Sequence, residues 1–473
     1  MLYSLIKSKG TSFSVILGGI FYIIGFIICI LLLFYLIQYI FEKIKRKIII
    51  KITIYFKNKQ ITTRIFELTK RKKIILLIIY CLLSIFLTIK LLKIDEYISF
   101  QLNDSKIFEL YYKDPKNVKI TFPEQKKNLI FIYVESLEMT AASKVNGGNQ
   151  KISYIPNLEN LALDSENINF SNKENLGGFF NPPGTGWTVA AMIGQTAGVP
   201  LKVSIDGNNY KNLGGSLPGA YSLGEILNKN GYKNYIMMGS DSNFGGRDEY
   251  FKMHGDYTIF DYNWAIKNSL IPEDYYEWWG FEDSKLFEFA EDSLNEISKK
   301  DEPFNFTLLT ADTHFIDGYL DESCETPFSK QYANTFHCSD SMIYKFINWV
   351  KNQDFYKDTV IIVVGDHLTM QSGFYNDKNY DRNVYNVFIN SDVNASNNKN
   401  RIISSFDIFP TTLASLGATI EGNRLGFGTN LFSKVKTLYE ELGIKYLDDE
   451  LSKKSFFYDN YILSDTYYKM NKD

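Results

Sequence analysis

Cysteine and histidine are scarce in this 473-residue chain, which has four of each. Neither cysteine pair, Cys29 with Cys81 or Cys324 with Cys338, has the spacing of a structural zinc site. An excess of one charge is also missing, because 51 basic and 54 acidic side chains leave a net charge of −3. That balance gives no support to nucleic-acid binding. The sequence also has no internal repeat and no low-complexity linker, so its informative features are local.

Charge is absent altogether between Thr11 and Phe41. A bilayer core needs roughly 20 apolar residues, so this run predicts a membrane helix. A second apolar run, residues 74–89, is shorter, but flanking lysines can extend its effective span. A cleaved signal peptide is the alternative for the first run, which is too long for one and is followed by no small-x-small site. We expect membrane helices at about 11–41 and 74–93.

The connector between these runs, residues 42–73, sets the expected topology. It carries twelve Lys or Arg against two acidic residues. By the positive-inside rule this connector is cytoplasmic, so both termini and the remainder of the chain face outward. Cys324 and Cys338 then lie on the oxidising side, where a disulfide between them is one possibility that spacing alone leaves open.

Beyond residue 127, short apolar runs alternate with amphipathic stretches, which is typical of an α/β protein built from βαβ units. Continuous apolar runs indicate parallel strands buried on both faces. The expected strands are 128–134, 232–238, 304–310, 359–364 and 384–389, and the expected helices include 223–230 and 339–352. The predicted organisation is a membrane anchor at 1–93, a linker at 94–127, a catalytic domain at 128–433 and a C-terminal tail at 434–473.

Two of these strands end in residues that bind metals. One apolar run stops at Glu135, and another stops at Gly365, followed by Asp366 and His367. In open α/β sheets, ligand chemistry gathers beyond the carboxyl ends of the strands. Two carboxylates and an imidazole at that edge form a suitable ligand set for Mn²⁺, Zn²⁺ or Mg²⁺.

A nucleophile for phosphoryl transfer requires an exposed, activated hydroxyl. The segment 181–188 offers two, Thr185 within a Gly-Pro turn and Thr188 at its end. The small apolar residues that follow suit a buried helix, whose N-terminus would favour an anion beside Thr188. Two alternatives stay open: Thr188 merely caps that helix, or Thr185 is the hydroxyl that meets the metal.

Together these segments resemble the membrane phosphoglycerol transferases and lipoteichoic acid synthases of the alkaline phosphatase–sulfatase superfamily. The resemblance covers roughly residues 128–433 and rests first on Glu135, on Thr188 followed by Ala191, and on Asp366 with His367. The glucan-modifying branch is matched further by residues 239–247, 254–255, 310–314, 338–340, 366–370 and 406–412. The resemblance implies an alkaline phosphatase/sulfatase-like sheet sandwiched by helices, with an N-terminal two-helix membrane anchor.

The resemblance also implies a cofactor and a reaction. One divalent ion is expected, manganese first and magnesium or zinc as alternatives, with Glu135, Thr188, Asp366 and His367 as ligands. The small number of histidines favours one ion over two. A glycerophosphoryl group would pass from phosphatidylglycerol to Thr188, and then to a periplasmic or cell-surface glycan. The implied location is a bacterial inner (cytoplasmic) membrane with an extracytoplasmic catalytic domain, and nucleic acid is not an expected partner.

Further residues receive roles from the same resemblance. His314 would bind the phosphoryl group or protonate the leaving alkoxide, with Asp312 beside it. Arg247 would hold phosphate oxygens, for which its planar fork is suited, unless it is an ordinary surface arginine. Trp187 would line the glycerol pocket unless it is a core residue, and Asp241 completes the proposed substrate-binding set.

The sequence departs from several relatives. The C/S-x-P-x-R motif of sulfatases is absent, since residues 188–192 read Thr-Val-Ala-Ala-Met. Phosphoethanolamine transferases share the threonine but are usually rich in disulfides. The larger glucan-modifying relatives have more membrane helices than the two counted here, which leaves the acceptor in doubt. The alternatives are therefore a phosphoethanolamine transferase, a phosphate or sulfate ester hydrolase, or a non-catalytic binding protein on the same fold.

Overall fold

The computed structural model describes Tyr35, Tyr39 and residues 49–56, 59–67, 70–91, 98–99, 102–202, 216–371, 373–375 and 379–464. The chain divides into two compact units, Met1–Asp104 and Ser105–Asp473, and each is described by itself. The membrane helix expected at 11–41 lies outside the described residues except for Tyr35 and Tyr39.

The first unit contains a hairpin that the sequence analysis did not predict. Strands β1 (Ile49–Phe56) and β2 (Lys59–Glu67) pair in antiparallel fashion, with Phe56 opposite Lys59. Isoleucines at alternate positions from 50 to 54 supply the two-residue period of a strand, within a segment whose basic residues had indicated only a cytoplasmic connector. Helix α3 (Lys70–Leu91) follows, close to the expected 74–93. Among the described residues, no helix combines the length and the apolar character needed to cross a membrane.

The second unit is built on a six-stranded sheet in the order β6-β5-β7-β4-β8-β9. All neighbouring strands are parallel except β9, which runs antiparallel to β8. The strands are β4 (Asn128–Val134), β5 (Lys233–Met238), β6 (Thr258–Phe260), β7 (Phe304–Leu309), β8 (Thr359–Gly365) and β9 (Asn386–Ile389). The five predicted strands are thereby confirmed, and only the three-residue edge strand β6 was missed.

Both faces of this sheet are buried, which explains the continuous apolar runs. In β4, Leu129, Phe131 and Tyr133 pack into one apolar cluster. The intervening Ile130, Ile132 and Val134 pack into a second cluster on the opposite face. The central strand therefore has no side that faces water.

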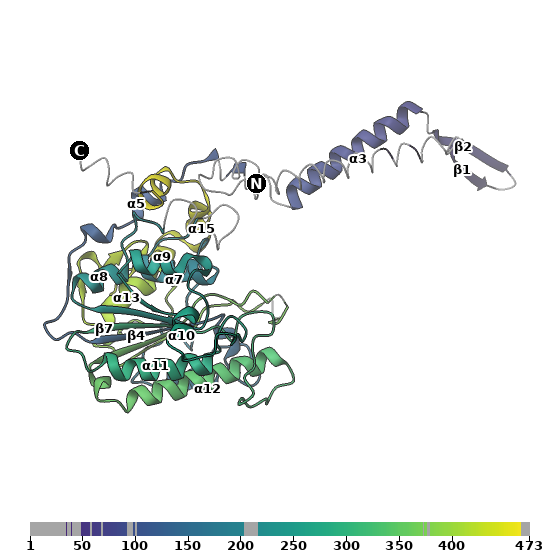
Figure 1. Cartoon of the computed structure of the whole chain (residues 1–473). Coiled ribbons are helices and arrows are strands. Elements are labelled where there is room, and N and C mark those ends of the chain that lie inside the picture. The colour runs from purple at the N-terminus through teal and green to yellow at the C-terminus, as the bar shows by residue number, and fades with distance from the viewer. Residues whose placement is uncertain are drawn as a thin grey trace. The chain divides into compact units, whose positions relative to one another are not determined.

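Helices cover the two faces as separate layers (Figure 1). One layer consists of α7 (Thr188–Ala197), α8 (Leu223–Lys229), α9 (Arg247–Met253) and α13 (Ile408–Ser415). The other consists of α6 (Pro156–Leu163), α10 (Tyr262–Lys267), α11 (Asp283–Ile297) and α12 (Gln331–Lys351). The expected α/β fold with a sheet between helices is confirmed. Helix α12 begins eight residues before the predicted 339, because Tyr332 and Phe336 continue its buried stripe among polar residues.

The compact unit extends beyond both predicted limits of the catalytic domain. On the N-terminal side it includes α5 (Ile107–Tyr111) and β3 (Ile120–Thr121), which pairs with β10 (Thr419–Ile420). On the C-terminal side, after β11 (Arg424–Leu425) and β12 (Gly428–Thr429), come α14 (Leu438–Leu442) and α15 (Ile444–Ser452). Leu447 and Leu451, one helical turn apart on α15, are buried. The segments 105–127 and 434–464 are thus part of the folded unit, and not merely a linker and a tail.

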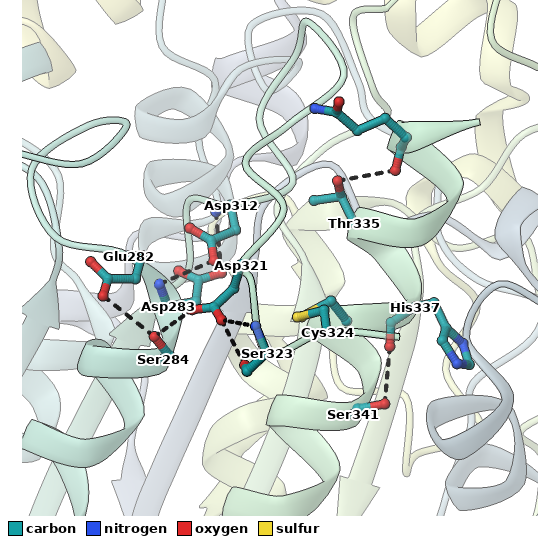
Figure 2. The surroundings of a disulfide bond; sticks show 12 residues. Glu282, Asp283, Ser284, Asp312, Asp321, Ser323, Cys324, Thr335, His337 and Ser341 are labelled. Carbon is teal, nitrogen blue, oxygen red and sulfur yellow. Dashed lines mark hydrogen bonds between the residues drawn. A yellow bond between two sulfur atoms is a disulfide. The ribbon is translucent and has the colours of Figure 1, made fainter. Parts of the chain in front are cut away.

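A disulfide joins Cys324 to Cys338, with 5.5 Å between their Cα atoms (Figure 2). Cys324 lies in the long loop between β7 and α12, and Cys338 lies within α12. The pairing that the sequence left open is therefore present, and it fastens this loop to the helix that follows it.

Candidate metal and phosphoryl-transfer site

The pairing register of β4 and β8 brings the predicted metal ligands together. Val134 lies opposite Gly365, so Glu135 and Asp366 follow at the same edge of the sheet. The Nε2 atom of His367 is 3.4 Å from Asp366 Oδ2 and 3.6 Å from Glu135 Oε1. All three side chains are buried, and one ligand atom from each lies within 4.8 Å of the others.

Backbone groups orient Asp366 and His367 toward one point. Asp366 Oδ1 accepts hydrogen bonds from the backbone N–H groups of Ser136 (2.8 Å) and His367 (2.7 Å). Its Oδ2 is buried and has no hydrogen-bond partner within the described part of the chain. His367 Nδ1 is 2.8 Å from the carbonyl oxygen of Leu368. Since a carbonyl can only accept, Nδ1 carries the proton and the lone pair on Nε2 is available to a metal.

Glu135 is fixed by neighbours that the sequence analysis had not assigned. Its Oε1 accepts from the hydroxyl of Ser136 (2.7 Å), whose backbone is left-handed with φ 58°. Its backbone N–H donates to Thr310 Oγ1 (3.1 Å), and its carbonyl accepts from Thr313 Oγ1 (2.5 Å). A non-glycine residue with positive φ is uncommon, and here it turns the chain directly after a buried strand. Ser136 is adjacent to Glu135, but Thr310 and Thr313 are 175 and 178 positions away, so no sequence pattern indicates these two partners.

The site concentrates negative charge away from water. Burial raises the pKa of Asp366 to about 7, and the neighbouring Glu135 carboxylate adds to that effect. Burial also acts to raise the pKa of Glu135, but the charges of His367 and His314 outweigh it and the pKa falls below its ordinary value. Burial acts to lower the pKa of His367, yet the two carboxylates dominate and raise it. An orphaned carboxylate oxygen, a second carboxylate and an imidazole lone pair at one buried point match the donors that a divalent cation binds.

Thr188 stands next to this ligand set. It is the first residue of α7, and the preceding Trp187 occupies the N-cap position without a side-chain capping bond. The Thr188 hydroxyl donates to Glu135 Oε2 at 3.0 Å and lies 3.5 Å from His367 Nε2. The alternative that Thr188 merely caps its helix is therefore wrong, because its hydroxyl reaches across to the ligands. Because α7 begins at Thr188, the N–H groups of its first turn, which lack partners within a helix, favour a bound anion near this hydroxyl.

Thr185 has a different environment although it is only three residues away. Its side chain is fully buried, and its hydroxyl donates to the carbonyl oxygen of Pro182 at 2.7 Å.

Gln195, which the sequence analysis missed, donates from Nε2 to the carbonyl oxygens of Gly365 and Asp366, both at 3.2 Å. It ties α7 to the end of β8 and so fixes Thr188 relative to Asp366.

His314 lies close enough to Glu135 for its charge to lower the pKa of that carboxyl. Its Nδ1 donates to the carbonyl oxygen of Phe315 (2.6 Å), which leaves Nε2 as the ring nitrogen that can give or accept a proton. The ring of Trp279 meets the imidazole edge to face, with 4.8 Å between ring centroids. Asp312, predicted to bind substrate with His314, is instead buried against Asp283, whose backbone N–H donates to Asp312 Oδ2 at 3.2 Å.

The other predicted substrate-binding residues divide by environment. Arg247 is 5% exposed, so it is not an ordinary surface arginine, and it donates to Phe244 O, Ser240 Oγ and Asp241 O. Asp241 is exposed, and its Oδ1 accepts from the N–H of Asn243 in a local turn. Trp187 is half-buried beside the nucleophile position, and its indole N–H is buried without a partner among the described residues. Of these three, Trp187 is the one whose donor faces no protein acceptor.

Solved structures of other proteins share this fold. The lipoteichoic acid synthase LtaP from Listeria monocytogenes superposes with a TM-score of 0.52 at 20% identity, over 67% of this chain and 79% of that one. An alkaline phosphatase superfamily protein from Vibrio parahaemolyticus superposes with a TM-score of 0.50 at 20% identity, over 70% and 76% of the two chains. At this identity the likeness concerns the fold alone.

Sequence relatives are closer. Phosphoglycerol transferase I from Salmonella typhi is 33% identical over 292 residues, which are 59% of this chain and 36% of that protein. Phosphoglycerol transferase I from Escherichia coli (strain SMS-3-5 / SECEC) is 33% identical over 273 residues, or 56% and 33% of the two chains. The matched region spans about a third of the length of these relatives. The sulfatase family model matches residues 127–418, which is more than half of the chain and includes every ligand described above. The chain therefore belongs to the sulfatase family, within the alkaline phosphatase superfamily that its sequence resembles.

Proposed function

We propose that this protein is a membrane-anchored, metal-dependent phosphoglycerol transferase. It moves a glycerophosphoryl group from phosphatidylglycerol to a periplasmic or cell-surface glycan, through a covalent intermediate on Thr188. The observation that carries the proposal is the Thr188 hydroxyl, which lies 3.0 Å from Glu135 and 3.5 Å from His367 at a helix N-terminus. The 33% identity to proteins named phosphoglycerol transferase I supports the transferred group.

Sulfate-ester hydrolysis, the activity for which the family is named, is disfavoured by the nucleophile. Sulfatases depend on a cysteine or serine that becomes formylglycine within C/S-x-P-x-R. This chain has threonine at that place and neither the proline nor the arginine in residues 189–192. A β-branched hydroxyl is a phosphoryl nucleophile, and it has no route to formylglycine.

In the first step the Thr188 oxygen attacks the donor phosphorus. The Thr188 proton passes to Glu135 Oε2, to which the hydroxyl already donates, and a bond forms between Thr188 Oγ1 and phosphorus. The bond from phosphorus to the diacylglycerol oxygen breaks, and that oxygen takes a proton, which His314 is positioned to give. The products are diacylglycerol and a glycerophosphoryl ester of Thr188.

In the second step an acceptor hydroxyl replaces the threonine. His314, now without its proton, accepts the proton of the sugar hydroxyl as that oxygen attacks phosphorus. The ester bond to Thr188 breaks, and the threonine oxygen takes back the proton from Glu135, which restores its hydroxyl. The unpaired N–H groups at the start of α7 are oriented toward the phosphoryl oxygens in both steps, and the Trp187 indole N–H is an additional donor.

The residues that would hold the ion are Glu135, Asp366 and His367, with Thr188 beside them. A divalent ion at that place supplies Lewis-acid stabilisation of the charge that develops on the threonine and phosphoryl oxygens. Manganese is our first choice, with magnesium and zinc as alternatives. The orphaned Oδ2 of Asp366 is the structural reason to expect an ion at all.

Anchoring at a bacterial inner membrane with the catalytic unit outside is part of the proposal. It is supported by the uncharged run at 11–41, the basic connector and the large apolar side chains exposed along α3, such as Ile78, Leu82 and Phe86. The Cys324–Cys338 disulfide also fits an oxidising compartment. A site confined near the bilayer surface would meet a lipid donor directly.

The decisive assay follows the head group of phosphatidylglycerol. Full-length protein with Mn²⁺ is incubated with vesicles containing phosphatidylglycerol labelled in the head-group glycerol, with and without a periplasmic glucan. We expect labelled glucan and stoichiometric diacylglycerol, both lost in Thr188→Ala. Label that appears only as free glycerol phosphate would identify a hydrolase. Transfer from phosphatidylethanolamine in preference to phosphatidylglycerol would identify a phosphoethanolamine transferase, and either result would contradict the proposal.

A further inference from the structure

His314 is carried by a loop without regular secondary structure, so something must hold it in place. The loop runs from the end of β7 at Leu309 to the start of α12 at Gln331. At its far end the Cys324–Cys338 disulfide fastens it to α12. At its near end, close to His314, the fastening is a carboxylate from another element, Asp283.

Asp283 binds the backbone of this loop at two adjacent residues, of which Figure 2 shows Asp312. Its Oδ1 accepts from the N–H of Ala311 at 2.8 Å, and its Oδ2 accepts from the N–H of Asp312 at 3.1 Å. In return, the N–H of Asp283 donates to Asp312 Oδ2 at 3.2 Å. The three bonds form a reciprocal link between the first residue of α11 and the turn that leads directly to His314.

The residues before Asp283 contact the same turn. The indole N–H of Trp278 donates to the carbonyl oxygen of Ala311 at 3.1 Å. The ring of Trp279 packs against the imidazole of His314 itself. The segment 278–283 therefore fixes both the backbone before His314 and one side of its ring.

Burying two adjacent carboxyl groups costs free energy, which indicates that this link does more than hold the loop in place. Asp283 is 1% exposed and Asp312 is 3% exposed. Burial raises the pKa of Asp283 to about 7, and Glu135 and Glu282 add to it against the two backbone donors. Two adjacent carboxyl groups without a basic partner oppose each other's ionisation. An uncharged side chain would avoid that cost, but an amide has only one oxygen and would leave one of the two N–H groups unpaired.

We propose that Asp283 is a positioning residue for His314, fixing the imidazole at the reacting phosphorus through the backbone of Ala311 and Asp312. The inference rests on the role proposed above for His314. It assigns a function to a residue at the start of α11, outside every motif by which the family was recognised. Asp283 touches no metal ligand in this account, so its loss should affect proton transfer and leave the ion in place.

The test is a double-mutant cycle on the full-length, metal-loaded protein in vesicles. We expect Asp283→Ala to lower kcat for phosphatidylglycerol turnover roughly 10- to 100-fold, part of the 10²–10⁴ that general acid–base catalysis typically contributes. KM and metal stoichiometry should stay near the wild-type values. In a His314→Ala background the same change should cost no further activity, because Asp283 acts through the imidazole. Asp283→Asn keeps one acceptor and should recover part of the loss, while Asp292→Ala, exposed on the same helix, is the matched control.

A second readout does not depend on turnover. The chain has four histidines, so imidazole ¹⁵N NMR of the Zn²⁺-loaded protein in micelles gives few signals, and His314→Ala assigns one of them. Asp283→Asn, the milder change, should shift the His314 signal and leave those of His254 and His337. A shifted signal in a protein that transfers no glycerophosphoryl group would refute the proposed function and keep this inference. Additive losses in the cycle, or an unmoved His314 signal, would overturn the inference while leaving the proposed function intact.

Discussion

Two pairs of buried carboxyl groups, Asp366 with Glu135 and Asp283 with Asp312, lie at the carboxyl edge of the same sheet, and we assign them different functions. In the first pair, Asp366 keeps one oxygen without a partner in the described structure, and Glu135 accepts only hydroxyls. In the second pair, both carboxylate oxygens of Asp283 accept hydrogen bonds from backbone N–H groups of a loop. The first pair has His367 beside it, whereas the second forms no hydrogen bond to a basic side chain within the described part of the chain.

The difference shows that burial of acids does not by itself mark a metal site. Both Asp366 and Asp283 have a pKa raised to about 7, with burial as the main cause in each. Each pair has one carboxylate oxygen without a hydrogen-bond partner in the described structure, Asp366 Oδ2 in the first and Asp312 Oδ1 in the second, so the pairs differ in what lies beside them. Oxygens left open toward an imidazole and a hydroxyl invite a cation, whereas oxygens saturated by backbone donors organise a loop.

The largest effect we predict is on metal binding, and it should differ between the two pairs when one carboxylate is removed from each. Asp366→Ala should abolish stoichiometric metal binding and reduce transfer by several orders of magnitude, since the ion's ligand set is lost. Asp283→Ala should bind the ion normally. Metal content after gel filtration, with far-UV circular dichroism as the folding control, decides this. Stoichiometric metal in Asp366→Ala, or none in Asp283→Ala, would erase the distinction between the pairs.

Proton competition should make the first pair sensitive to pH. The pKa of Asp366 is raised to about 7 by burial and by Glu135, and that of His367 is raised by the two carboxylates. Protonated Asp366 and His367 must lose their protons to bind an ion, so metal affinity should fall as the pH is lowered, by about tenfold per unit for each proton displaced. Calorimetric titration with Mn²⁺ between pH 8 and pH 6 measures this, with proton release confirmed in buffers of different ionisation enthalpy. Equal affinities across that range would show that the ligands are not protonated in competition with metal.

The disulfide should matter for stability more than for the ion. Cys324 and Cys338 are separated by 14 positions, and a cross-link of that span stabilises by about 3 kcal/mol in the chain-entropy model. The double variant Cys324→Ser with Cys338→Ser should therefore lose about that free energy of unfolding in urea titrations. Its metal affinity should match the wild type, because none of the ligands lies in the closed loop. A variant that unfolds no more easily would show that the loop is held by other contacts, such as those of Asp283.

Thr185→Ala is expected to have the smallest effect. It removes one buried hydrogen bond to Pro182 O, worth about 1 kcal/mol, and leaves the Thr188 hydroxyl in place. Thermal unfolding and the transfer assay should show a slightly lower Tm and activity close to wild type. A loss of activity comparable to that of Thr188→Ala would mean that the turn itself, and not only the helix start, forms the site.

The sequence predicted the parts of this fold that burial dictates. Five of the six strands could be read from apolar runs because both faces of the sheet are covered. Glu135, Asp366 and His367 could be found because the site lies where those runs stop, and the register then brings them together. Strand β6 lacked such a pattern because three residues are too few to show a period. The first two turns of α12 lacked it because their apolar residues are mixed with polar ones.

Contacts between distant loops could not be predicted in the same way. Nothing near Asp283 in the sequence indicates that it meets Ala311 and Asp312, because the pairing depends on how α11 packs beside β7 and its loop. The same link, in which Asp312 Oδ2 accepts from the N–H of Asp283, could not be foreseen when Asp312 was predicted to bind substrate. Gln195 was missed likewise, since its partners are main-chain carbonyls of another strand.

The central claim is that Thr188, and not Thr185, carries the glycerophosphoryl group. Protein incubated with Mn²⁺ and phosphatidylglycerol vesicles, without acceptor, is digested and mapped by tandem mass spectrometry. The account predicts a glycerophosphoryl adduct on Thr188, present in Thr185→Ala and absent in Thr188→Ala. An adduct on Thr185, or one that persists in Thr188→Ala, would contradict it.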